Sequence, residues 1–124
     1  MLLSQCQLVV SEAGKPDRRF PLGDQFTIGR DEKSDLVLND RLVSRHHCIL
    51  ILDDCGRHFV QDGHASTGRA SRNGIYINGS KERVTITRLK SGDVISISAT
   101  TQAKYLCAHD TDGDRGTYSG EQNG

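Results

Sequence analysis

The 124-residue chain lacks several features that would assign it to a large class of proteins. It has no net charge, because 16 basic residues balance 16 acidic ones, so the overall positive charge of a duplex-binding protein is missing. No apolar run approaches the roughly 20 residues of a membrane-spanning helix. The first residues, Met1 to Cys6, contain neither a basic segment nor a long apolar run, which argues against a secretory signal. The sequence therefore predicts a cytoplasmic domain with no membrane contact.

Cysteine pairs with the spacing of a metal site are also missing. The four cysteines stand at positions 6, 48, 55 and 107 and form no CxxC motif, and Cys48 and Cys107 lie within apolar runs. This distribution favours small buried thiols in a reducing compartment over disulfides or zinc ligands. We therefore expect free cysteines and neither a metal nor another cofactor.

What the chain does contain is a series of short apolar or alternating runs, separated by turn residues that include many of its 13 glycines. No window carries a sustained apolar repeat of 3.6 residues, so no long helix is expected. The pattern predicts an all-β domain, with a sandwich as the simplest architecture. The candidate strands are Leu2–Val10, Phe20–Leu22, Gln25–Ile28, Leu36–Leu38, Cys48–Leu52, Arg57–Gln61, Ile75–Ile77, Lys81–Leu89, Val94–Ser98 and Lys104–Ala108.

The strongest hairpin signal is Asn78-Gly79, because both residues tolerate the positive φ angles of a type I′ turn. It predicts pairing between the runs at 75–77 and 81–84. From residue 109 onward the chain has one aromatic and no aliphatic residue. We therefore expect a domain over residues 1–108 and a disordered tail or linker over 109–124.

The acidic residues of this tail partly match a calcium-binding loop. Asp110, Asp112, Asp114 and Glu121 have the spacing of EF-hand ligands, but Arg115 stands where the loop requires glycine, and no flanking helices are expected. A solvated acidic tail is the preferred interpretation.

Polar motifs lie at the ends of several predicted strands. They are, in chain order, Gly29-Arg30, Ser44-x-x-His47, Asn73-Gly74, Asn78-Gly79 and Gly92-Asp93. In this order and spacing they resemble the forkhead-associated (FHA) domain family, and the resemblance covers residues 1–108. It implies a sandwich of about eleven mostly antiparallel strands, with a phosphothreonine site on the loops at one end.

The resemblance also implies roles for single residues. Arg30 and Ser44 would contact the phosphate, and Asn73 would hold the peptide backbone. An arginine fork and a serine hydroxyl are suitable donors for a phosphate that carries about −1.5 to −2 charge. Arg45 and Arg72 flank these positions and are expected to add donors. The residues expected to support the binding loops are Gly29, His47, Gly74, Asn78 and Gly79.

Two features depart from the family pattern. Ile75 stands where the family commonly has Thr or Ser, which removes a hydroxyl that would tie the loops together. The stretch His64–Ala70 also appears as an extension of the loop before Asn73. Neither change affects Arg30, Ser44 or Asn73, so phosphopeptide binding remains the favoured interpretation.

Other functions fit the sequence less well. Catalysis is disfavoured because no GxSxG, P-loop or HExxH motif is present, and nothing indicates an oxyanion hole beside Ser44 and His47. Nucleic-acid binding by the basic residues lacks interleaved aromatic side chains for stacking. We expect a monomeric, non-catalytic signalling module that binds phosphothreonine peptides and no nucleic acid. A protein-binding module that uses the same loops without phosphorylation is the alternative. The basic residues considered for nucleic-acid binding are Arg41, Arg45, His46, Arg69 and Arg72.

Overall fold

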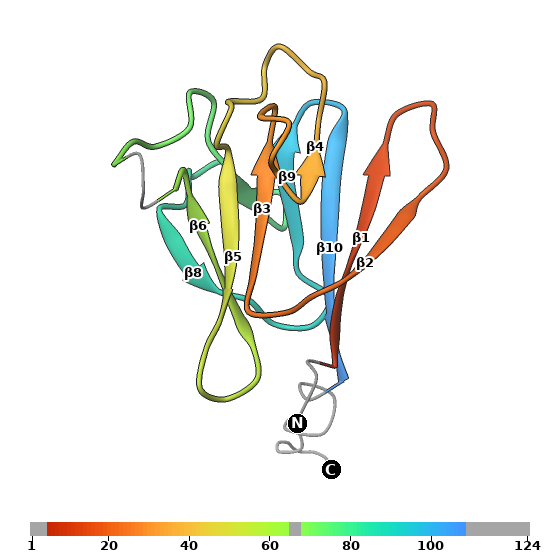
Figure 1. The fold of residues 1–124 in the computed structure, drawn as a ribbon, viewed down its shortest axis with the longest axis vertical. Helices are drawn as coiled ribbons and strands as arrows, with labels where there is room; N and C mark the ends of the chain where they lie inside the picture. The colour runs from red at the N-terminus through yellow and green to blue at the C-terminus, as the bar shows by residue number, and fades with distance from the viewer. Residues whose placement is uncertain (1–4, 65–67, 109–124) are drawn as a thin grey trace.

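The computed structural model describes residues 5–64 and 68–108, which form two five-stranded sheets packed face to face (Figure 1). This confirms the predicted all-β sandwich, with ten strands in the described residues in place of about eleven. No helix within those residues is long and apolar enough to cross a membrane. The strands are β1 (Cys6–Glu12), β2 (Arg18–Pro21), β3 (Gln25–Gly29), β4 (Leu36–Val37), β5 (Cys48–Leu52), β6 (His58–Asp62), β7 (Tyr76–Ile77), β8 (Ile86–Arg88), β9 (Val94–Ser98) and β10 (Thr101–Cys107).

The two sheets enclose a single hydrophobic core. Sheet A has the strand order β2-β1-β10-β9-β7, and sheet B has the order β4-β3-β5-β6-β8. Alternation along the strands fills the space between them: in β9, for example, Ile95 and Ile97 are buried while Ser96 between them is half-buried. The largest fully buried apolar side chains include Leu8, Ile28, Leu36, Leu38, Leu50, Ile75, Leu89 and Tyr105.

The register of sheet B brings three loops to one end of the molecule. Ile28 at the end of β3 lies opposite Cys48 at the start of β5, and Cys48 lies opposite Asp62 at the end of β6. The β3–β4, β4–β5 and β6–β7 loops therefore leave the sheet together, at the top of Figure 1. Three of the motifs, Gly29-Arg30, Ser44-x-x-His47 and Asn73-Gly74, meet there.

The Asn78-Gly79 turn forms, but the runs on its two sides do not pair as neighbouring strands of one sheet. Both residues have positive φ, 53° and 76°, and Ser80 N donates to Ile77 O at 3.0 Å. However, β7 pairs with β9 in sheet A, and the chain beyond the turn continues to β8 in sheet B. The runs at 75–77 and 81–84 share one backbone hydrogen bond, from Val84 N to Ile75 O at 3.0 Å, and Val84 packs against the core. The predicted strand pairing was nevertheless wrong, because residues 81–83 are polar and exposed, whereas β9 supplies Ile95 to the core.

The prediction of free cysteines was also wrong for one pair. Cys6 in β1 and Cys107 in β10 form a disulfide across 101 residues of sequence. The β1–β10 register places the two residues directly opposite each other, which the sequence spacing alone does not reveal. Cys48 and Cys55 are free thiols. Burial raises the pKa of the Cys48 thiol, which makes this group unreactive.

Candidate functional site

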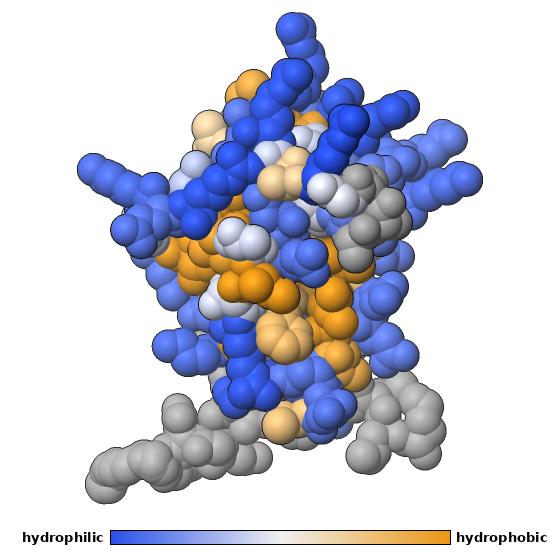
Figure 2. Space-filling model, turned by 90° about the vertical axis from the view of Figure 1, so that its left-hand side faces the viewer, coloured by the Kyte–Doolittle hydropathy of each residue, from blue (hydrophilic) through white to orange (hydrophobic). Residues whose placement is uncertain are grey.

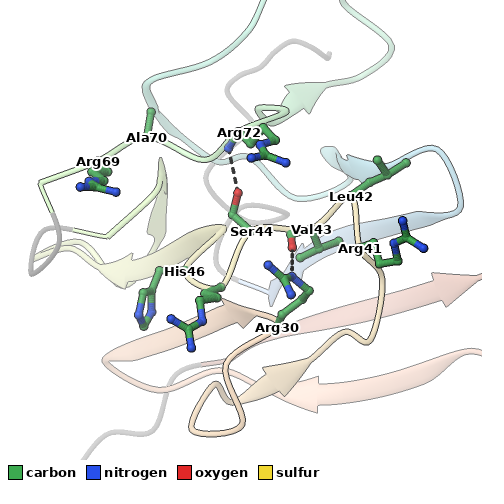
Figure 3. A pocket seen from close by; sticks show the side chains of 10 residues that line it. Arg30, Arg41, Leu42, Val43, Ser44, His46, Arg69, Ala70 and Arg72 are labelled. Atoms are coloured by element: carbon green, nitrogen blue, oxygen red, sulfur yellow. Dashed lines mark hydrogen bonds between the residues drawn. The ribbon is translucent and has the colours of Figure 1, made fainter.

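The three loops surround an open pocket of about 700 Å³ (Figure 3). Long hydrophilic side chains project from this end of the molecule (Figure 2). The lining is strongly basic, because each loop contributes at least one arginine. These are Arg30 from β3–β4, Arg41 and Arg45 from β4–β5, and Arg69 and Arg72 from β6–β7.

Arg30 is held at the pocket by the neighbouring loop. Its Nε donates to Val43 O at 2.6 Å, and its backbone N donates to Ser44 O at 3.1 Å. Because Nε is used in this way, the guanidinium is fixed in orientation while its two terminal nitrogens remain for a ligand. The terminal nitrogens of an arginine form a donor fork that suits two phosphate oxygens.

Ser44 joins two of the loops and keeps its own donor. Its Oγ accepts a hydrogen bond from the backbone N of Arg72 at 2.8 Å (Figure 3). A hydroxyl has one proton to donate, and this contact uses only an acceptor position. The Ser44 proton is therefore available to an anion in the pocket, beside the Arg72 side chain.

Asn73 lies next to a second, smaller hollow. Its Nδ2 donates to Leu42 O at 2.8 Å, which fixes the amide orientation because a carbonyl oxygen can only accept. The hollow has a volume of about 210 Å³, and Asn73 and Leu42 line it together with Tyr76 and Ile97. Leu42 lines both cavities, so the hollow lies beside the basic pocket.

His47 is fully buried and connects the β4–β5 loop to the β6–β7 loop. Its Nδ1 accepts from Ser44 N at 3.0 Å, and its Nε2 donates to Gly74 O at 2.9 Å. These partners require the neutral tautomer with the proton on Nε2. Burial, which outweighs the opposing bond to Gly74, lowers the pKa of His47 below its usual value.

The backbone at Gly29 passes too close to the β4–β5 loop for any side chain. A Cβ at this position would lie 1.9 Å from Arg45 O. Glycine therefore allows Arg30 and Ser44 to form their backbone hydrogen bond. Gly74 has a φ of 83° and a Cβ there would meet the Arg83 side chain at 2.8 Å, so the end of the β6–β7 loop is equally restricted.

Asn78 and Gly79 do not contact the pocket directly. The Asn78 side chain donates from Nδ2 to Asp93 Oδ1 at 3.0 Å and accepts from Val94 N at 2.9 Å. Asp93 in turn accepts from Lys90 N at 2.8 Å. These bonds join the end of β7 to the start of β9, so any support of the binding loops passes through the strand β7.

Sequence reasoning missed the ion pair that orders the β6–β7 loop. Asp62 Oδ2 accepts from Arg83 Nε at 3.2 Å and from Nη2 at 3.1 Å, while Asp62 Oδ1 accepts from Ser71 N at 3.1 Å. Arg83 Nη2 also donates to Ser71 O, and Ser71 Oγ accepts from Gly74 N. The Asp62 side chain is only 3% exposed, so the carboxylate requires these partners.

The network of Asp62, Arg83 and Ser71 holds the β6–β7 loop in place of the hydroxyl that Ile75 lacks. The Ile75 side chain is fully buried in the core, where a Thr or Ser hydroxyl would need a partner. Arg83 and Asp62 tie the loop instead, from a polar run and a strand end that carried no motif. The sequence signal for this network was Asp62, a charged residue at the end of an apolar strand.

The site has no assembled nucleophile. His47 contacts the backbone N of Ser44, whereas the Ser44 hydroxyl is hydrogen-bonded to Arg72 N, so His47 is not positioned as a base for Oγ. The residues that the structure describes also contain no group of three His, Cys, Asp or Glu side chains that could hold a metal. The EF-hand-like residues Asp110, Asp112, Asp114 and Glu121 lie outside the described residues.

Fold and pocket together define a β-sandwich with a basic pocket on the loops at one end. The family model of the FHA domain matches residues 26–98, which is more than half of the chain. The chain therefore belongs to the FHA domain family.

Three solved structures illustrate the similarity. The Slr1951 protein from Synechocystis sp. is 25% identical, with a TM-score of 0.71, over 82% of this chain and 96% of that one. The FHA domain of CT664 from Chlamydia trachomatis is 24% identical, with a TM-score of 0.68, over 83% and 97%. Mycobacterium tuberculosis EmbR, in complex with a low-affinity phosphopeptide, is 24% identical, with a TM-score of 0.63, over 82% of this chain and 24% of that one. No curated protein matches the sequence.

Proposed function

We propose that the domain is a phosphothreonine-dependent, non-catalytic interaction module. The observation that carries the proposal is the convergence of donors at the pocket, where Arg30 keeps its terminal nitrogens and Ser44 keeps its hydroxyl proton. Arg45 and Arg72 add positive charge, and Asn73 presents an amide that can bond to the peptide backbone. That EmbR was solved with a phosphopeptide supports the same use of this fold.

Threonine selectivity is the finer part of the proposal. Arg30 and Ser44 would bind phosphoserine and phosphothreonine alike, so charge does not discriminate between them. The apolar side chains of Leu42 and Ala70 also line the pocket and offer a surface to the γ-methyl group. One buried methyl-sized group is worth about 1–3 kcal/mol, or roughly 10–200-fold in affinity.

A fluorescence-polarisation titration with three peptides tests the proposal. They share one sequence and carry phosphothreonine, phosphoserine or threonine at the central position. We expect phosphothreonine to bind at least about tenfold more tightly than phosphoserine, and threonine not to bind measurably. Equal binding of both phosphopeptides would exclude the methyl site, and equal binding of all three would favour the phosphorylation-independent alternative.

We also propose that the domain is monomeric, binds no nucleic acid and is located in the cytoplasm. A single-stranded RNA titration and a sedimentation measurement test the absence of nucleic-acid binding and the monomeric state. The disulfide between Cys6 and Cys107 bears on the proposed cytoplasmic location, because stable disulfides are typical of oxidising compartments. A fluorescent fusion, imaged in the source cells, decides the location.

A further inference from the structure

Two large apolar side chains are exposed among residues 5–64 and 68–108, and they lie on different surfaces. Leu42 is 57% exposed and lines the basic pocket. Ile86 is 54% exposed and lies in β8, the outermost strand of sheet B, where it lines neither of the two cavities. The pocket accounts for the exposure of Leu42, whereas nothing in the proposed function accounts for that of Ile86.

Ile86 belongs to an apolar strip on the outer face of sheet B. It lies diagonally across from Phe59 in β6, and Phe59 in turn lies opposite Ile51 in β5. Both of these side chains are half-buried and alternate with residues of the core, so they project from the outer face together with Ile86. On the side of the molecule where β8 lies, apolar side chains gather below the hydrophilic loop end (Figure 2). A sheet face that meets water is normally polar, so the strip indicates a surface that another molecule covers.

The free edge of β8 also carries open backbone groups. Next to the two ends of the strand, Thr85 O accepts a hydrogen bond from β6 at 2.9 Å and Leu89 N donates one to β6 at 2.8 Å. Hydrogen-bonded positions alternate along an antiparallel strand, so the backbone of Thr87 faces β6 and the backbone groups of Ile86 and Arg88 face away from it. No other strand in the described part of the chain pairs with β8. The N–H and C=O groups of Ile86 and Arg88 therefore remain open to a ligand.

The other edges of the two sheets are protected in ways that β8 is not. Strand β2 carries Arg18 and Arg19 and ends on Pro21, which has no N–H to donate. Strands β4 and β7 have only two residues each. In β8 the charged side chain, Arg88, is held by Asp53 in the β5–β6 turn, with Nε and Nη2 at 2.9 and 2.6 Å from Oδ2. Among the edges of the described sheets, β8 alone combines open backbone groups with an exposed large apolar side chain.

The open backbone groups define the kind of ligand that fits. Another extended main chain presents N–H and C=O groups with the matching two-residue repeat, whereas a helix uses its own groups internally. An added strand would place every second side chain on the outer face, and one of them would lie beside Ile86. A second copy of the chain would offer only its own three-residue β8 at this edge. Each partner in a stable protein interface contributes roughly 20–30 residues, so a separate partner fits better than self-association.

We propose that the β8 edge binds an extended segment of a partner protein by strand addition, with an apolar side chain of that segment packed on Ile86 and Phe59. The ligand class is a short segment in which apolar and polar residues alternate. Its recognition involves neither a phosphate nor the pocket, so the inference goes beyond the proposed function and does not depend on it.

Amide hydrogen exchange, followed by NMR on the full chain, tests the proposal. The probes are short capped peptides in which threonine alternates with valine, isoleucine, leucine or phenylalanine, added up to millimolar concentration. The amides of Ile86 and Arg88 should exchange rapidly in the free protein and at least about fivefold more slowly when a peptide is bound. The amide of Thr87, which faces β6, should change little.

Matched controls exist for the peptide and for the protein. A peptide with N-methyl groups on alternate backbone amides keeps its side chains but cannot donate to the edge, so it should give no protection. I86A should weaken peptide binding about fivefold, because it removes the apolar contact. I86T, which keeps the branched side chain of a strand residue, should weaken binding as well. L42A removes the other exposed apolar side chain and should bind the probes like wild type.

Several results would overturn the inference. They are equal protection by the N-methylated peptide, protection of other amides without those of Ile86 and Arg88, and absence of binding by every peptide in the set. Slower exchange at Ile86 on raising the protein concentration, without peptide, would place a second copy of the chain at the edge and would also overturn it. I86A should bind the phosphothreonine peptide like wild type, so strand addition and phosphopeptide binding can each fail while the other stands.

Discussion

Arg30 is the residue on which the proposed binding depends most, because its orientation is set before a ligand arrives. Its Nε is held by Val43 O, so less side-chain freedom is lost when the terminal nitrogens bind phosphate. We expect R30A to weaken phosphopeptide binding at least tenfold, on the order of 1.5–3 kcal/mol for hydrogen bonds to a charged group. Isothermal titration calorimetry measures the loss.

The control for Arg30 is R19Q, which removes the same charge from β2, outside the pocket end. It should bind like wild type. Circular dichroism should show the same β spectrum for both variants, because Arg30 is an exposed loop residue. Unchanged affinity in R30A, with an intact spectrum, would remove Arg30 from the site.

Two buried histidines make the stability of the domain sensitive to mild acid. Burial lowers the pKa of His47 and of His58, whose Nε2 bonds to Gly23 O at 2.9 Å. A lowered folded-state pKa means that the unfolded chain takes up protons first as the pH falls. The stabilisation is fully present above the unfolded value of about 6.5 and is lost as the pH falls below it, towards the lower folded-state pKa.

We therefore expect urea midpoints to fall between pH 7.5 and about pH 5. The aspartates with lowered pKa, Asp31, Asp40 and Asp53, act in the same direction but only nearer to pH 4, below this window. His47→Asn should be less stable at neutral pH and less sensitive to pH in the window. A midpoint that is constant from pH 7.5 to 5 would contradict this account.

At the scale of elements, the β6–β7 loop depends on the side chain of a residue outside it. Arg83 joins Asp62 at the end of β6 to the backbone of Ser71. R83A would leave a carboxylate that is 3% exposed with only the Ser71 amide as partner. We expect a stability loss of about 1–3 kcal/mol and weaker phosphopeptide binding, because Arg72 and Asn73 lose their fixed backbone.

The matched variant for Arg83 is R88A, which breaks the Arg88–Asp53 pair on sheet B at the β5–β6 turn. Thermal melts and peptide titrations of both variants measure the effect. R88A should bind peptide like wild type. R83K should recover stability only partly, because lysine retains the charge without the donor fork. If R83A melts and binds like wild type, the ion pair does not order the loop.

Comparison of the predicted strands with the observed ones shows which features can be predicted from the sequence. The ten candidate strands all have counterparts, because alternation and turn residues are local signals. The end of β3 was predicted to within one residue and the start of β5 was predicted correctly, and these ends place Arg30 and Ser44 at the same end of a sheet. The partner of β7 was missed, since pairing depends on which distant strand buries apolar surface. The Arg83–Asp62 pair was missed for the same reason, as 21 residues separate its members.

At the scale of the whole molecule, the disulfide joins the first and last described strands. Closing a loop of about 100 residues constrains the unfolded chain, and native disulfides typically contribute about 2–4 kcal/mol. We expect a reducing agent to lower the melting temperature by roughly 10 °C or more. A thiol titration of the denatured, unreduced protein should find two thiols, from Cys48 and Cys55.

Cysteine variants separate this effect from other actions of the reductant. The double variant C6S/C107S should melt low with or without reductant, whereas C55S should remain sensitive to it. Four thiols in the unreduced protein, or equal melting temperatures in both conditions, would show that the disulfide is not formed.

The position of that bond has a mechanical consequence. Cys6 and Cys107 lie opposite each other in adjacent antiparallel strands, and the pocket loops lie at the far end of the sandwich. Tension applied through both ends of the chain would run from one strand to the next across the covalent bond. Strands β2–β9 and the three binding loops would carry no force. A peptide should therefore dissociate at the same rate from a stretched molecule as from a relaxed one, until the disulfide is reduced.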